Sequence, residues 1–115
     1  MYRISVALCS LALAACGGGS SESQSAVSIV KSLGSLQCSG GGATVTALQS
    51  LLVKAGVQVL ALSCGNDGAA HPAVCGDPDG AIAIFDVPSH QEAAAQALGF
   101  ALLSSLPNAT KTACQ

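Results

Sequence analysis

The chain has 115 residues, a length that bounds it to one domain. Half of its residues are hydrophobic and 9% are charged, which is too apolar a balance for a disordered protein. The net charge is −2 and the few charges are scattered, so the chain has no basic footprint for nucleic acid. Aromatic residues make up only 3%, and we therefore expect a core of Ala, Val, Leu and Ile.

The first fifteen residues have the three parts of a secretory signal peptide. Arg3 gives a positive start, residues 4–15 are mainly apolar, and small residues close the run. This run is shorter than the roughly 20 apolar residues that a permanent membrane-spanning helix needs. We expect residues 1–15 to be a signal peptide that is cleaved.

The end of the apolar run resembles the lipobox of bacterial lipoproteins, over residues Leu13, Ala14, Ala15 and Cys16. In that family the processing enzymes recognise the residues before the cysteine. The cysteine thiol receives a diacylglycerol group, and cleavage makes it the first residue of the mature chain. The resemblance implies lipid attachment at Cys16, with membrane lipid as a partner through its acyl chains (palmitate, for example). Each buried CH₂ contributes about 0.8 kcal/mol, so more than one chain gives stable anchoring.

The residues after the lipobox predict where the protein is held. In Gram-negative members of the family an Asp after the cysteine favours retention in the inner membrane. Gly17 therefore implies the periplasmic face of the outer membrane. Residues 16–25 are then the lipidated cysteine and a flexible Gly/Ser tether, and residues 26–115 are the exported domain.

The first half of this domain has a helical pattern. In residues 26–36 apolar side chains recur near period 3.6, which predicts a helix. A second helix is predicted over residues 43–55, with Gly56 at the position that follows a helix C-terminus.

The second half of the domain contains two apolar, β-branched runs. Residues 57–63 and residues 81–87 each predict a strand. A last helix is predicted from the S-x-x-E capping box of Ser89 and Glu92 to Pro107.

These elements predict a small α+β domain in the order helix-helix-strand-strand-helix. Consecutive strands joined by a loop are most simply antiparallel, and helices would cover one face of the pair. Two strands alone are marginally stable, so we expect disulfides to staple the fold.

The cysteine count supports that expectation. Of six cysteines, Cys9 leaves with the signal peptide and Cys16 is blocked by lipid. Four cysteines in an exported domain fit two disulfides, with three possible pairings. We favour one bridge within the loop between the predicted strands and one between the first helix region and the C-terminal tail. The four residues, in these pairs, are Cys64 with Cys75 and Cys38 with Cys114.

The loop of residues 64–80 is the most unusual stretch, and it allows several interpretations. Its Asp, Asn, Pro and Gly residues have the chemistry of tight turns, which is a structural role. Alternatively Cys64, His71 and Cys75, with His90 as a candidate fourth ligand, offer S and N ligands for Zn or Cu, although their spacings are unusual. A calcium loop built on two aspartates of this stretch lacks the further ligands that calcium needs.

No catalytic or cofactor motif stands out, such as G-x-S-x-G or a phosphate-binding G-K-[ST]. We therefore expect a binding or structural module that is neither an enzyme nor a cofactor carrier. Its partner would be another envelope protein or a component such as cell-wall glycan, contacted through the 65–80 loop or exposed sheet edges. The alternative is a periplasmic metal-binding or redox-sensing module that uses the Cys64–Cys75 loop.

Overall fold

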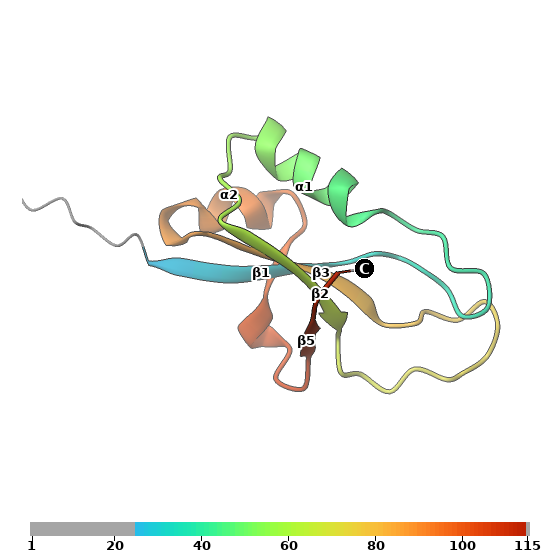
Figure 1. Cartoon of the computed structure of the whole chain (residues 1–115). Coiled ribbons are helices and arrows are strands. Elements are labelled where there is room, and N and C mark those ends of the chain that lie inside the picture. The colour runs from blue at the N-terminus through green and yellow to red at the C-terminus, as the bar shows by residue number, and fades with distance from the viewer. Residues whose placement is uncertain (1–24, 115) are drawn as a thin grey trace, which may run out of the picture.

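A computed structural model describes residues 25–114, which form a five-stranded antiparallel sheet with two α-helices (Figure 1). The predicted α+β class is confirmed, whereas the predicted order of elements differs from the one observed. The strands are β1 (Ala26–Ser32), β2 (Ala61–Asn66), β3 (Ala81–Pro88), β4 (Ala101–Leu102) and β5 (Thr110–Thr112). The helices are α1 (Val45–Lys54) and α2 (Glu92–Ala97), and two 3₁₀ turns are η1 (Ser89–Gln91) and η2 (Leu103–Ser105).

Strand β3 is the centre of the sheet, whose strand order is β4-β1-β3-β2-β5. Its Phe85 lies opposite Ile29 of β1 on one side and opposite Leu62 of β2 on the other. The predicted antiparallel pairing of the two apolar runs is therefore present, as β2 with β3. These two strands are only part of a larger sheet, in which β1 pairs with β3 along most of the length of β3.

Apolar side chains of β3 alternate between two packed faces, because successive residues of a strand point to opposite sides. Phe85 belongs to the larger cluster, together with Leu48 and Leu52 of α1 and Ala95 of α2. Phe100 packs its ring edge-to-face against Phe85, with the ring centroids 5.9 Å apart. The helices thus lie over this face of the sheet, as Figure 1 shows.

The opposite face carries a smaller cluster of Val30, Ile82 and Ile84. The residues that pack against it come from the segment 103–109, which includes η2. Since β4 and β5 lie at opposite edges of the sheet, this segment crosses the face from one edge to the other. It supplies Leu103, Leu106 and Ala109 to the cluster.

The predicted helix over residues 26–36 is wrong, because residues 26–32 form strand β1. Ile29 and Val30 are both buried, one in each cluster, since both faces of β1 are covered here. A strand buried on both faces has adjacent apolar residues rather than strict alternation. With Val27 and Leu33 flanking that pair, the spacing imitates a helical stripe.

The predicted helix over residues 43–55 is confirmed as α1, and Gly56 follows it with a left-handed φ of 80°. The Gly56 N–H donates to the Val53 carbonyl, and the Val57 N–H donates to the Leu52 carbonyl at 2.9 Å. These bonds make a Schellman motif. The strand predicted over residues 57–63 begins later, at Ala61, because residues 57–60 connect the end of α1 to the sheet. Neither described α-helix is long and apolar enough to cross a membrane.

The predicted last helix is much shorter than expected, since α2 ends at Ala97. Gly99 has φ 92°, and the Phe100 N–H donates to the Ala95 carbonyl, which is a second Schellman motif. The predicted capping box is not formed: η1 and α2 begin without a side-chain cap, and the Ser89 hydroxyl lies 2.9 Å from that of Ser25.

Candidate functional site: a disulfide-stapled lobe

Two loops leave the sheet together and form what we call the lobe, residues 33–43 and 67–80. Ser32 at the end of β1 lies opposite Ile82, and Asn66 at the end of β2 lies opposite Ala81. The start of β3 is therefore flanked by the ends of both neighbouring strands, and both loops begin at one end of the sheet. In Figure 1 the lobe extends to the right of the sheet, opposite the end at which the described chain begins.

Backbone hydrogen bonds join the two halves of the lobe. The Gln37 N–H donates to the Asp77 carbonyl at 2.8 Å, and the Gly76 N–H donates back to the Gln37 carbonyl at 3.2 Å. The Asp79 N–H reaches the Ser35 carbonyl at 3.2 Å. The first half also closes on itself, because Leu36 and Gly40 exchange two such bonds.

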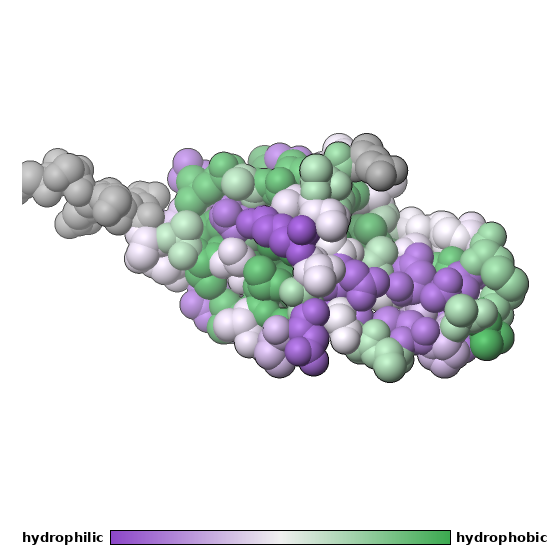
Figure 2. Space-filling view, turned by 60° about the horizontal axis from the view of Figure 1, so that its bottom comes forward, coloured by the Kyte–Doolittle hydropathy of each residue, from purple (hydrophilic) through white to green (hydrophobic). Residues whose placement is uncertain are grey.

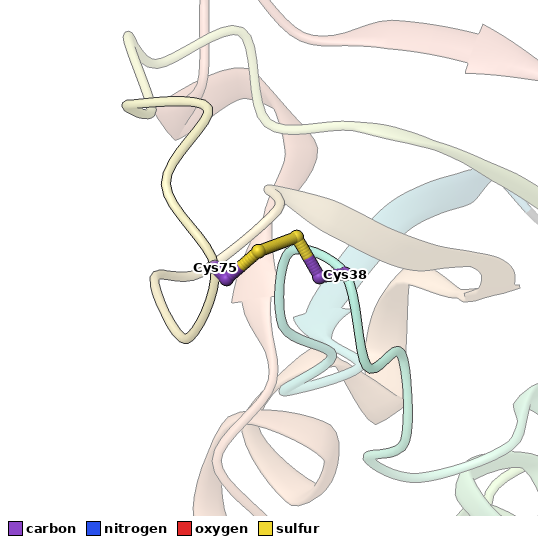
Figure 3. Close-up of a disulfide and its surroundings, with 2 residues drawn as sticks. All are labelled: Cys38 and Cys75. Carbon is purple, nitrogen blue, oxygen red and sulfur yellow. A yellow bond between two sulfur atoms is a disulfide. The ribbon is translucent and has the colours of Figure 1, made fainter.

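Two disulfides are present, but their pairing differs from the predicted one. Cys38 bonds Cys75, with Cα atoms 5.1 Å apart, and Cys64 bonds Cys114, with Cα atoms 4.9 Å apart. The physical reason is that β2 carries Cys64 into the sheet opposite Thr112, close to Cys114 in the chain. Cys75 instead lies against the turn after β1, so the bridge of Figure 3 joins the two halves of the lobe.

The lobe has no apolar core. Gly80 is its only buried residue, and the rest are exposed or half-buried. Its geometry therefore depends on hydrogen bonds, on the Cys38–Cys75 bridge and on backbone turns. A Cβ at Gly80 would lie 2.7 Å from the His71 ring, so a side chain at this position would displace the imidazole.

The Asp79 carboxylate ties the base of the lobe together. Its Oδ1 accepts from the Ala81 N–H at 2.9 Å and from the Ser35 hydroxyl at 2.8 Å. These two hydrogen bonds favour the charged form, so the pKa of Asp79 is lowered from its ordinary value. Asp79 is therefore ionised at neutral pH.

A second carboxylate, that of Asp67, pairs with His71 within the lobe. The His71 Nε2 atom lies 2.9 Å from Asp67 Oδ1 and 2.8 Å from Oδ2. Burial raises the pKa of Asp67, but the hydrogen bonds from the Ala69 N–H and from His71, with the attraction of the imidazole, lower it overall. The pair fixes the path of the loop over residues 67–71.

The surface of the lobe is mixed in character. It carries three aspartates and no lysine or arginine, and two large apolar side chains, Leu36 and Val74, are exposed on it. Figure 2 shows hydrophilic residues over this part of the molecule and hydrophobic ones at its far end. A disulfide-bonded backbone, negative charge and exposed apolar side chains together suit contact with another molecule.

The residues predicted as a metal site do not come together. The sulfur atoms of Cys64 and Cys75 belong to different disulfides, and His71 is paired with Asp67. His90 lies in η1, at the other end of β3. Among residues 25–114, no three His, Cys, Asp or Glu side chains gather as a metal site.

Comparisons of this chain with protein-family models, with curated proteins and with solved structures found no match. The candidate site is therefore inferred from the residues of this chain alone.

The residues of the predicted lipid attachment, Cys16 with Leu13, Ala14 and Ala15, lie outside the described residues. The predicted signal peptide and tether lie outside them as well, apart from Ser25.

Sequence reasoning found half of the lobe and missed the rest. The sequence predicts the 65–80 loop as a contact surface, but over residues 33–43 it predicts only the end of a helix and a break. The signal that could have found them is the run of glycines from Gly40 to Gly42, all with left-handed φ. Also missed was a shallow hollow of about 460 Å³ on the sheet face opposite the helices. It is lined by Val27, Ser28, Leu103, Ser104, Leu106, Pro107 and Ala109.

Proposed function

We propose that this chain is an exported lipoprotein, anchored through acylated Cys16 at the periplasmic face of the outer membrane, whose domain binds an envelope partner through the lobe. The partner is an envelope protein or cell-wall glycan, and the role is binding rather than catalysis. The observation that carries the proposal is the pair of disulfides. Disulfides persist in oxidising compartments outside the cytoplasm, which supports export.

The disulfides also agree with the cysteine arithmetic of the lipobox. All four cysteines of the described chain bond one another, and the two that remain are Cys9 and Cys16. Cys9 lies within the proposed signal peptide, and Cys16 is the proposed acylated residue. This division supports a free thiol at Cys16 that lipid attachment consumes.

The direction of the chain supports the lobe as the contact surface. The described residues begin at Ser25, whose carbonyl accepts from the Ser89 N–H at the end of the sheet away from the lobe. Strand β1 then runs seven residues toward the lobe, about 23 Å at roughly 3.3 Å per residue. An anchor before Ser25 thus leaves the lobe free to reach outward from the membrane.

The binding role is tested by photo-crosslinking in living cells at two matched positions. Val74 in the lobe and Val53 on α1 are both exposed valines, 57% and 59% accessible respectively. A photoreactive amino acid in place of Val74 is expected to give one dominant covalent adduct, while the same group in place of Val53 gives none. Mass spectrometry of the adduct distinguishes an envelope protein from cell-wall glycan.

Equal crosslinking at the two positions would show that the lobe is not the contact surface. No adduct at either position would argue against a binding role. Both outcomes can be interpreted only if each variant keeps its two disulfides, which mass measurement before and after alkylation establishes.

A further inference from the structure

We propose that the Cys38–Cys75 bridge is a site of thiol–disulfide exchange with external dithiols, whereas the Cys64–Cys114 bridge is structural. This inference goes beyond the proposed function and does not depend on a membrane anchor or on a binding partner. It assigns separate chemistry to two bridges that the sequence alone does not distinguish.

The first argument is access. Cys38 and Cys75 are both exposed, and the bond between them joins two loops, as Figure 3 shows. Cys64 and Cys114 are half-buried. An attacking thiolate must approach a disulfide sulfur directly, so exposed bridges are the labile ones.

The second argument is the backbone around each bridge. Cys64 is held within β2, opposite Ala83 on one side and Thr112 on the other, so opening its bridge does not free it from the sheet. Cys38 lies in a turn with φ 71° and is the only non-glycine residue with positive φ among residues 25–114. Few side chains adopt this conformation freely, and release of the bridge allows the turn to relax.

Opening the bridge to two thiols is a two-electron reduction, and a dithiol supplies both electrons. One thiolate of the dithiol attacks a sulfur of the Cys38–Cys75 bond, and the other cysteine leaves as a thiolate and takes up a proton. The second thiol of the reagent then attacks the mixed disulfide and releases the first cysteine. The reagent ends as a disulfide, and the protein ends with two free thiols.

Reduction at this site changes the lobe and leaves the sheet in place. The lobe has no apolar core, so after the bridge opens its halves are joined by backbone hydrogen bonds and by the Ser35–Asp79 side-chain hydrogen bond. Segments with few buried contacts open most readily. The two clusters on the sheet contain neither Cys38 nor Cys75 and keep their packing.

The test treats the full chain with limiting dithiothreitol, quenches with acid at intervals, labels free thiols with a maleimide and maps them by peptide mass spectrometry. Label is expected on Cys38 and Cys75 at least tenfold faster than on Cys64 and Cys114. In the same time course, amide hydrogen exchange should accelerate in residues 33–43 and 67–80 while residues 82–87 remain protected.

Equal rates for the two bridges, or faster labelling of Cys64 and Cys114, would overturn the proposal. The double variant Cys38→Ser/Cys75→Ser provides the matched control, since it should lose the fast phase and retain the slow one. If this variant does not fold, the wild-type time course decides alone. These rates are measured without membrane or partner, so their failure leaves the proposed function intact.

Discussion

The carboxylate of Asp79 acts at the joint between lobe and sheet, because it accepts hydrogen bonds from both. Ser35 donates from the first half of the lobe, and Ala81 donates from the first residue of β3. The Asn66 side chain adds a third contact at this joint by donating to the Asp79 carbonyl at 3.2 Å. One residue thus connects three segments that are distant in the sequence.

Ser35→Ala should raise the pKa of Asp79 toward its ordinary value, because one of the two groups that stabilise the carboxylate is lost. A lowered pKa stabilises the folded lobe at pH above the ordinary Asp value, and this contribution is lost as the pH falls through the lowered pKa. In the variant this contribution should be smaller, and its loss should be complete at a higher pH than in the wild type. A carboxyl-carbon NMR titration measures the shift.

Ser39→Ala is the matched control, since Ser39 is an exposed serine of the same lobe. We expect this variant to titrate like the wild type. An unchanged Asp79 pKa in Ser35→Ala, or an equal shift in both variants, would show that the hydroxyl of Ser35 does not set it.

At the scale of elements, the helix ends determine where the chain turns. Both α1 and α2 are followed, two residues after the last helical one, by a glycine and then a buried apolar residue. These are Gly56 with Val57 and Gly99 with Phe100. Both apolar residues join the larger cluster beneath the helices. Each Schellman motif therefore ends a helix and returns the chain to the core.

Thr44→Ala should destabilise the domain by about 0.5–2 kcal/mol, the usual cost of losing a helix N-cap. The Thr44 hydroxyl accepts the Ala47 N–H at 3.0 Å, and no other side chain caps α1 at this end. Urea unfolding followed by circular dichroism measures the difference. Thr46→Ala, two residues further into the helix, should lose nothing or gain a few tenths of a kcal/mol; an equal loss in both variants would contradict the capping role.

The same elements explain how much of the fold could be predicted. Helix α1 and strand β3 were found because each has a clear signal, an apolar stripe closed by Gly56 and a β-branched run closed by Pro88. The sequence does not predict β1, because a strand that is covered on both faces lacks the alternation of apolar and polar residues. Gly99 has the same role as Gly56, but the apolar residues that follow it read as more helix.

The predicted disulfide pairing is wrong because residues 26–32 form strand β1 and not the predicted helix. A helix over residues 26–36 gives no reason for Cys38 to lie beside Cys75, whereas strand β1 beside β3 brings it there. The number of bridges follows from the cysteine count, but their partners follow from sheet order, which is long-range information. The candidate site was therefore predicted in its second half only.

At the scale of the whole molecule, the proposed anchor precedes β1 in the sequence and the first half of the lobe follows it. Cys16→Ala should leave a precursor that keeps residues 1–15, takes up no labelled fatty acid and no longer fractionates as a lipidated protein. The reason is that the thiol of Cys16 is the proposed site of acylation, and in lipoproteins of this kind cleavage follows acylation. Metabolic labelling and intact mass measure both.

Cys9→Ala is the control for that experiment, because it removes the other N-terminal cysteine and should be processed normally. Normal fatty-acid labelling of Cys16→Ala would refute the anchor. Loss of labelling in both variants would also contradict it, since Cys9 has no role in the proposed attachment.

The central position of β3 has a consequence for how the chain folds. Ala26 pairs with Pro88, and the strands at both edges come after α2, so no half of the sequence contains a complete sheet. Loop-closure entropy must be lost before such distant pairings form, which slows folding. The sheet therefore cannot be completed until nearly all of residues 26–112 have been synthesised, which agrees with the proposed export of an unfolded chain.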